Sequence, residues 1–219
     1  RLLRALLNVR PPMPVSAEFL SLQDEYLTER KNERGIINVN DFVYTDGVAL
    51  FKGDIITLNA DVIVNAANSA MLGCFHPLHN CIDNAIHTFA GVQVRLDCND
   101  IMKGNEAKNG EVIVTKAYNL PSKFIFHTVG PVVYGRVTEE NKSDLAKCYL
   151  NCLAKADEMK LKSIAFCCIS TGVFGYPKEG AAQLAVKAVR EYKAQTSSSL
   201  KIIFDVFTEN DYELYRRIL

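Results

Sequence analysis

Short apolar runs rich in β-branched residues alternate with longer segments of helical periodicity over most of the chain. We expect six strands, at residues 48–51, 62–64, 112–115, 124–128, 164–168 and 202–207. We expect helices at residues 81–90, 138–160, 178–194 and 210–218. The strand runs are almost continuously apolar, which is typical of a sheet covered on both sides. The pattern therefore predicts a three-layer α/β/α domain with a central mixed, mostly parallel sheet.

The first 40 residues follow a different pattern, with three prolines close together before any strand. After them, Ser16 is expected to cap a helix that runs to about Asn32, with Gly35 as its stop. We interpret residues 1–40 as an N-terminal helical extension packed on the domain that residues 41–219 form. This extension either braces the sheet or helps to select a protein substrate.

Composition and charge narrow the classes of function. The 219 residues include 25 basic and 25 acidic side chains, and this balance disfavours binding to nucleic acid or to an anionic membrane. No apolar run approaches the roughly 18 residues of a membrane-spanning helix, and residues 1–7 lack the cleavage site of a signal peptide. Seven cysteines, an odd number in a chain of this size, favour a reducing compartment. We expect a cytoplasmic protein.

A cluster of two thiols and two imidazoles carries the strongest local signal for chemistry. Cys74, His79 and Cys81 have a C-x4-H-x-C spacing, which a loop can fold around one Zn²⁺ ion. Three ligands with an open fourth position fit a catalytic zinc, although His76 is a possible fourth ligand. The alternative is a set of buried thiols beside an exposed histidine.

Polar residues follow several of the expected strands. Asn65 and Asn68 either bond the local backbone or hold sugar hydroxyls. Asp83 lies at the start of an expected helix, where its charge is favourable, and near zinc it could activate a water instead. His87 shares a helix face with Asp83 and is expected to be packed or hydrogen-bonded.

The segment of residues 170–176 lies between an expected strand and an expected helix. Its glycines, Gly172 and Gly175, allow the backbone to turn several N–H groups toward one ligand. The positive end of the following helix would add to this effect, so the loop is a candidate cradle for phosphate groups. The alternative is an ordinary glycine-containing turn.

Five segments occur in an order that resembles a known family. They are residues 53–55, 64–68, 83–91, 127–131 and 170–177. Together they resemble a macrodomain, the ADP-ribose-binding module, of the MacroD-like hydrolase type. Where MacroD-like proteins carry a run of glycines, this chain has residues 73–81, which is similar to the zinc-containing macrodomains of bacteria and some fungi. The resemblance then implies zinc held by Cys74, His79 and Cys81, with His76 outside the ligand set.

The resemblance also implies roles for individual residues. Asp54 would accept a hydrogen bond from the adenine amino group beside Ile55, and Phe207 would pack on the adenine face. Asn68 would contact the distal ribose, with Phe174 packed near that sugar, and Asp83 occupies the catalytic acidic position. The diphosphate would be held by the loop that contains Ser170, Thr171, Gly172, Val173, Phe174, Gly175 and Tyr176. We accordingly expect Asp83 and Asn68 to be the catalytic residues.

The resemblance implies a zinc-dependent hydrolase that removes mono-ADP-ribose from O-linked Asp, Glu or Ser side chains. One alternative is a non-catalytic reader of ADP-ribosylated protein with a structural zinc, and another is an O-acetyl-ADP-ribose deacetylase. A reader would not need the Cys74, His79 and Cys81 triad. By the same resemblance, the implied partners are a modified lipoyl-carrier protein and a sirtuin-like ADP-ribosyltransferase.

Overall fold

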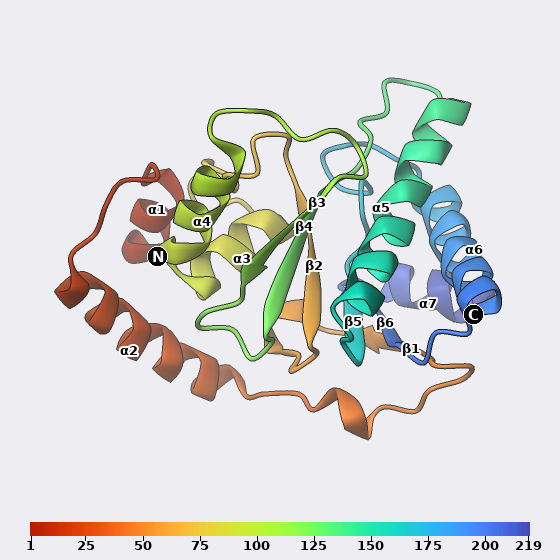
Figure 1. Ribbon diagram of the computed structural model, residues 1–219, viewed down its shortest axis with the longest axis horizontal. Helices are drawn as coiled ribbons and strands as arrows, with labels where there is room; N and C mark the ends of the chain where they lie inside the picture. The colour runs from red at the N-terminus through yellow and green to blue at the C-terminus, as the bar shows by residue number, and fades with distance from the viewer.

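Six strands form one sheet in the order β1-β6-β5-β2-β4-β3 in the computed structural model, which describes residues 1–219 (Figure 1). The strands are β1 (Val48–Lys52), β2 (Val62–Ala67), β3 (Val112–Lys116), β4 (Phe124–Val129), β5 (Ser163–Phe166) and β6 (Lys201–Val206). Only β3, which pairs with β4, runs antiparallel to its neighbour. The mixed, mostly parallel sheet and all six strands predicted from the sequence are confirmed, with shifts at the strand ends.

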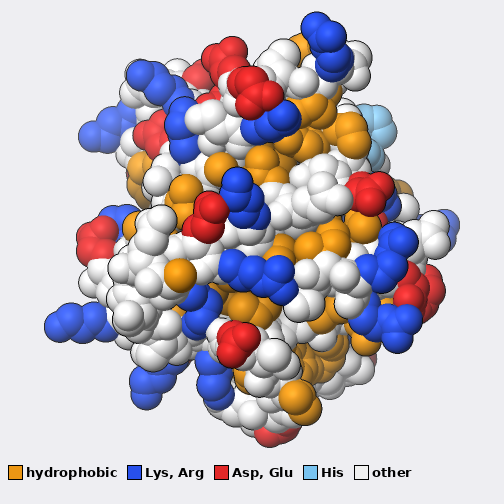
Figure 2. All heavy atoms as spheres, turned by 90° about the vertical axis from the view of Figure 1, so that its right-hand side faces the viewer, with side chains coloured by type: hydrophobic (Ala, Val, Ile, Leu, Met, Phe, Trp, Pro, Cys, Tyr) orange, Lys and Arg blue, Asp and Glu red, His pale blue; other side chains and the backbone are white.

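Helices cover both faces of the sheet, as the continuous apolar runs of the strands predict. Figure 1 shows α3 (Ile82–Ala90) and α4 (Val92–Met102) on one side. The other side carries α5 (Glu139–Glu158), α6 (Lys178–Thr196) and α7 (Glu209–Ile218). On the solvent side of α5 and α6, basic and acidic side chains are interspersed, and many form pairs one helical turn apart, such as Lys155 with Glu158 at 2.8 Å (Figure 2). No helix combines the length and apolar character that crossing a membrane requires.

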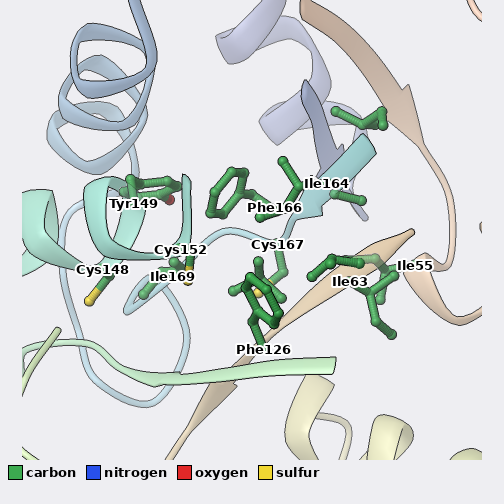
Figure 3. Close-up of a cluster of buried hydrophobic side chains, with 14 of the residues drawn as sticks. Ile55, Ile63, Phe126, Cys148, Tyr149, Cys152, Ile164, Phe166, Cys167 and Ile169 are labelled. Atoms are coloured by element: carbon green, nitrogen blue, oxygen red, sulfur yellow. The ribbon is translucent and has the colours of Figure 1, made fainter. Parts of the chain in front are cut away.

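The core between the sheet and α5 is built from large side chains that the strands project inward. Figure 3 shows the ring of Tyr149 of α5 beside that of Phe166 of β5, with Phe126 of β4 below them. The rings of Tyr149 and Phe166 lie 5.0 Å apart, which is a favourable aromatic distance. This core fixes the strands, and through them it fixes the position of every loop at their carboxyl ends.

Residues 1–40 form two helices, of which the sequence predicted one. α2 (Ala17–Arg34) begins after Ser16, whose hydroxyl accepts a hydrogen bond from the N–H of Phe19 at 3.1 Å, and it ends at Gly35 as expected. The first helix, α1 (Leu2–Val9), was not predicted, and neither was α4. Both lack a side-chain cap at their first turn, so the signal that marks a helix start is absent from their sequences.

Candidate functional site

The carboxyl ends of five parallel strands lie along one edge of the sheet (Figure 1). The segments that the sequence analysis selected follow these ends. Asp54 comes after β1, Asn68 after β2, residues 170–176 after β5, and Phe207 after β6. The segment of residues 73–81, called the Cys/His loop below, connects β2 to α3. Ligands of open α/β sheets bind at this edge, so the topology gathers the predicted residues where a ligand is expected.

Asp54 opens the short helix η2 (Ile55–Thr57), and its Oδ1 accepts a hydrogen bond from the N–H of Ile56 at 3.2 Å. Burial raises the pKa of Asp54, while the Ile56 N–H and the positive charge of Arg34 oppose that rise. The side chain of Ile55 is wholly buried in the core. Any contact of Ile55 with a ligand would therefore be made by its backbone, whereas Asp54 offers a side-chain oxygen.

The loop of residues 170–176 presents unused backbone N–H groups. Those of Gly172, Val173 and Phe174 make no hydrogen bond within the protein. The loop is held by other bonds, from the N–H of Tyr176 to the oxygen of Ser170 at 3.0 Å and from the N–H of Gly175 to the oxygen of Gly172 at 3.0 Å. Three free donors in a fixed loop ahead of the N-terminus of α6 are suited to an anion such as a diphosphate.

The aromatic side chains at this edge of the sheet differ in their exposure. Phe207, directly after β6, is 76% exposed, so its ring is free to stack on a planar ligand. Phe174 is half-buried, whereas Tyr176 is buried. Tyr176 therefore belongs to the loop through its backbone, while its ring is part of the core.

Asp83 lies at the start of α3 with its carboxylate held by two asparagines. The Nδ2 of Asn65 donates to Oδ1 at 2.8 Å, and the Nδ2 of Asn68 lies 3.4 Å from Oδ2. Asp83 is 5% exposed, and burial raises its pKa to about 6, against the Asn65 hydrogen bond and the positive charge of Arg95. A buried carboxyl with a raised pKa is typical of groups that exchange a proton with a substrate.

The Cys/His loop begins at Gly73, which contacts Asn68 and lies close to His87 of α3. The oxygen of Gly73 accepts a hydrogen bond from the Nδ2 of Asn68 at 3.0 Å. Its φ of 83° lies in the left-handed region, and a Cβ placed there would lie 2.8 Å from the ring of His87. Glycine is therefore required here by both the backbone conformation and the close approach of the histidine.

Replacing Gly73 by Ala should destabilise the protein by about 1–3 kcal/mol more than replacing Gly104, because the new methyl group collides with His87. Gly104 is a matched control, since its φ of 79° imposes the same backbone strain but its Cβ would meet no neighbour within 4 Å. Urea unfolding of the two variants measures the difference. Equal losses of stability would mean that the His87 contact is easily relieved.

The thiols of Cys74 and Cys81 and the ring of His79 converge into one group. Their three ligand atoms lie within 4.8 Å of one another, and the Sγ of Cys74 is 3.6 Å from the Nδ1 of His79. Ligand atoms around a tetrahedral zinc are about 3.5 Å apart, given Zn–S and Zn–N bonds of about 2.3 and 2.0 Å. The spacing and the donor types fit a single zinc ion, and His76 is not a member of the group.

Cys81 has a structural contact as well. Its Sγ accepts a hydrogen bond from the N–H of Asn84 at 3.4 Å and so caps the start of α3. Burial raises the pKa of the Cys81 thiol to about 12, and the nearby sulfur of Cys74 adds to the rise. The Cys81 thiol in this setting favours the protonated form, and a bound cation is what would hold it as a thiolate.

The chain is similar to a known protein family and to several of its members. Residues 64–185, more than half of the chain, match the Macro domain family. A protein-ADP-ribose hydrolase of Treponema medium is 49% identical over 225 residues, covering 100% of this chain and 86% of that protein. The chain belongs to the macrodomain family.

Two further similarities place this macrodomain among its relatives. The solved structure of the Trypanosoma brucei macrodomain in complex with ADP-ribose superposes with a TM-score of 0.76 at 28% identity, covering 98% of this chain and 94% of that one. A Fusarium oxysporum f. sp. cubense protein named "Probable bifunctional ADP-ribose hydrolase/ADP-ribosyltransferase" is 39% identical over 242 residues. That match covers 100% of this macrodomain and 40% of the fungal protein.

Two buried polar residues lie near these candidate residues and were not selected individually from the sequence of the macrodomain. Asp205 of β6 is buried, its Oδ1 has no hydrogen-bond partner, and burial together with the charge of Asp54 raises its pKa well above the usual value. His127 of β4 lies beneath the site, where its Nδ1 is 3.1 Å from the Nδ2 of Asn65. The position of Asp205 within an apolar strand was the sequence feature that could have drawn attention to it. His127 was included only as part of the segment of residues 127–131.

Proposed function

We propose that this macrodomain is a zinc-dependent hydrolase that removes mono-ADP-ribose from O-linked Asp, Glu or Ser side chains of proteins. The curated relatives support the hydrolase activity, and the ADP-ribose complex of the similar structure supports the ligand. One observation carries the zinc dependence: the loop that presents Cys74, His79 and Cys81 also binds Asn68 through Gly73 and leads directly into Asp83. A metal ion on that loop would lie next to the proposed catalytic residues.

The ligand would lie along the edge of the sheet with its ends at different loops. Asp54 would accept a hydrogen bond from the adenine amino group, and Phe207 would pack on the base. The free N–H groups of residues 172–174 would hold the diphosphate. The distal ribose would then reach Asn68 and Asp83, whose separation of 3.4 Å between Nδ2 and Oδ2 lets both contact one sugar.

The chemistry follows from the groups around the distal ribose. Zinc, when bound to the Cys/His loop, would supply a Lewis acid beside the sugar and the attacking water. Asp83 would accept a proton from that water as it attacks the anomeric carbon. Asn65 would hold the Asp83 carboxylate in place through its 2.8 Å hydrogen bond. Asn68 would orient a ribose hydroxyl.

The direct test uses a protein that carries mono-ADP-ribose on an acidic residue, with a serine-linked substrate in parallel. We expect the zinc-loaded enzyme to release ADP-ribose, and zinc stripping to stop the release until Zn²⁺ is added back. Zinc content is measured in every sample. A zinc-loaded sample that binds ADP-ribose but releases none from either linkage would instead indicate a reader.

Water labelled with heavy oxygen identifies the bond that breaks. Attack at the anomeric carbon, which we propose, places the label in the released ADP-ribose. Attack on an ester carbonyl would place it in the carboxylate of the protein substrate, and would remove the proposed role of Asp83 at the sugar. Release of acetate from O-acetyl-ADP-ribose, measured in the same assay, tests the deacetylase alternative.

The proposed biological setting is an ADP-ribosylation cycle with a sirtuin-like ADP-ribosyltransferase, and a lipoyl-carrier protein is the proposed substrate. The fungal relative supports the pairing, because its printed name joins a hydrolase and an ADP-ribosyltransferase in one chain. A hydrolase of this kind needs a transferase that supplies its substrate. Release of ADP-ribose from a modified carrier protein at a higher kcat/KM than from an unrelated modified protein would support this choice of substrate.

Replacing Asp54 by Ala should weaken ADP-ribose binding by about 1–3 kcal/mol, because the buried adenine amino group would lose its acceptor. Asp54→Asn controls for the structural role of Asp54, since its Oδ1 can still accept from the N–H of Ile56 and keep η2 in place. Titration calorimetry measures both affinities. An Asp54→Ala affinity equal to that of the wild type would contradict the assignment of Asp54 to adenine.

A further inference from the structure

Helix α1 lies beside α3 and touches the Cys/His loop from outside the macrodomain's sheet (Figure 1). The sequence analysis left the role of residues 1–40 open between bracing the sheet and selecting a substrate. The contacts of α1 indicate a third role, because one buried and one half-buried polar side chain bond to the backbone of the loop that presents the candidate metal ligands. Two residues one helical turn apart, Arg4 and Asn8, make these contacts.

Asn8 is 1% exposed, and both ends of its amide are engaged. Its Oδ1 accepts a hydrogen bond from the N–H of Leu78 at 3.0 Å. Its Nδ2 donates to the hydroxyl of Thr88 at 2.9 Å, and that hydroxyl donates to the oxygen of Asn84 at 2.7 Å. The amide therefore fixes the distance between the middle of the loop and α3. Neither of its partners, Leu78 and Thr88, is one of the candidate metal ligands.

Leu78, which donates to Asn8, has an unusual backbone conformation. Its φ of 58° lies in the left-handed region, which is unfavourable for a leucine, and its side chain is exposed and adds little packing. A strained backbone persists only where its surroundings hold it, and the hydrogen bond to Asn8 is a contact that does so. Because Leu78 precedes His79, its conformation sets the direction in which the imidazole points.

Arg4 and Asn84 hold the loop at two further points. The Nη2 of Arg4 donates to the oxygen of His79 at 3.2 Å and to the Oδ1 of Asn84 at 2.8 Å. The Nδ2 of Asn84 in turn donates to the oxygen of His76 at 3.0 Å. The backbone from His76 to His79 is thus tied to α1 and α3 on both sides of the strained residue.

We propose that Asn8 of α1 is a positioning residue, which holds the Cys/His loop in the conformation that brings His79 to Cys74 and Cys81. The inference rests on the proposed zinc function of this loop. Helix α1 would then support the metal site, although none of its residues belongs to the group of Cys74, His79 and Cys81.

The test compares three variants of the 219-residue chain. Asn8→Leu has a similar volume but no acceptor for the Leu78 N–H, and Asn8→Asp keeps that acceptor. Gln23→Met is the matched control, because Gln23 also lies in the extension, is buried, and accepts a backbone hydrogen bond, from Val92 at 3.0 Å, away from the loop. Any general loss of stability from the extension should therefore appear in Gln23→Met as well.

Two readouts are taken from each protein. The first is amide hydrogen exchange of residues 76 and 78–80 in the zinc-stripped protein, followed by NMR. The second is Zn²⁺ affinity, measured by competition with a chromophoric chelator. We expect Asn8→Leu to exchange these amides faster and to bind zinc about tenfold more weakly, as is typical when groups that orient metal ligands are removed. Asn8→Asp should recover most of the affinity, and Gln23→Met should leave both readouts unchanged.

The outcomes separate this inference from the proposed function. Wild-type protein that binds no Zn²⁺ would overturn the zinc function, and the inference with it. Wild-type protein that binds zinc, with Asn8→Leu binding it equally well, would overturn the inference alone. Equal losses in Asn8→Leu and Gln23→Met would also overturn it, since the effect would then be one of general stability.

Discussion

Replacing Cys81 by Ala should remove zinc from the protein and lower turnover of an ADP-ribosylated substrate at least about a hundredfold. The thiolate is one of three converging ligands, and two ligands without it make a weak site for zinc. ADP-ribose should still bind, because Asp54, Phe207 and the free N–H groups of residues 172–174 lie on other loops. Metal analysis, turnover and calorimetry on one preparation measure the three properties.

The same substitution also removes the cap that Cys81 provides to α3, so its effect needs to be separated from a structural one. Cys81→Ser keeps an oxygen that can accept the Asn84 N–H but lacks the soft sulfur that zinc prefers. Cys152→Ala removes a buried thiol of α5 that is far from the loop. We expect Cys81→Ser to behave like Cys81→Ala, and Cys152→Ala to keep zinc and turnover. Unchanged turnover in Cys81→Ala would refute the catalytic role of zinc.

The sheet could be predicted because each strand is a short apolar run, and such a run is by itself a local signal of a buried strand. The same reasoning placed Asp54, Asn68 and residues 170–176 at strand ends, and parallel strands then brought these segments to one edge. Local patterns were therefore enough to bring these candidate residues together, since the sheet sets the positions of the loops at the strand ends.

Other features depend on contacts that no local pattern encodes. Helix α1 has eight residues, too few for a stable isolated helix, and it is held by tertiary bonds such as that of Asn8 to the loop. Asp205 of β6 lies opposite Phe51 of β1 in the sheet, and its proximity to Asp54 depends on this pairing of distant strands. Ile55 was selected for its place beside Asp54, but the direction of its side chain, into the core, is decided by packing. Residues that act through distant neighbours become visible only in three dimensions.

Replacing Asp83 by Asn should lower kcat about 10²–10⁴-fold, the range that a general acid or base contributes. The change keeps an oxygen that can accept from Asn65 but removes the group that exchanges a proton. Because Asp83 is two residues from Cys81, zinc content is measured with the kinetics. Single-turnover assays at saturating enzyme then report the chemical step.

Asp61→Asn gives the matched control, since Asp61 is a second buried carboxylate at the opposite edge of the sheet, just before β2. It accepts from the N–H of Lys162 at 2.7 Å and pairs with Lys123 at 2.7 Å. These bonds lower its pKa in spite of its burial, so its charge stabilises the fold and its loss should lower the melting temperature but not kcat. Asp83→Asn should do the reverse, because burial raises the pKa of Asp83 in spite of the Asn65 hydrogen bond and the charge of Arg95, so the ionised carboxylate destabilises the fold. One outcome would remove Asp83 from the chemistry and leave zinc to activate the water. In that outcome, Asp83→Asn binds zinc, has wild-type ADP-ribose affinity, and keeps a kcat within about threefold of wild type. Such a loss is smaller than the smallest contribution expected of a general acid or base.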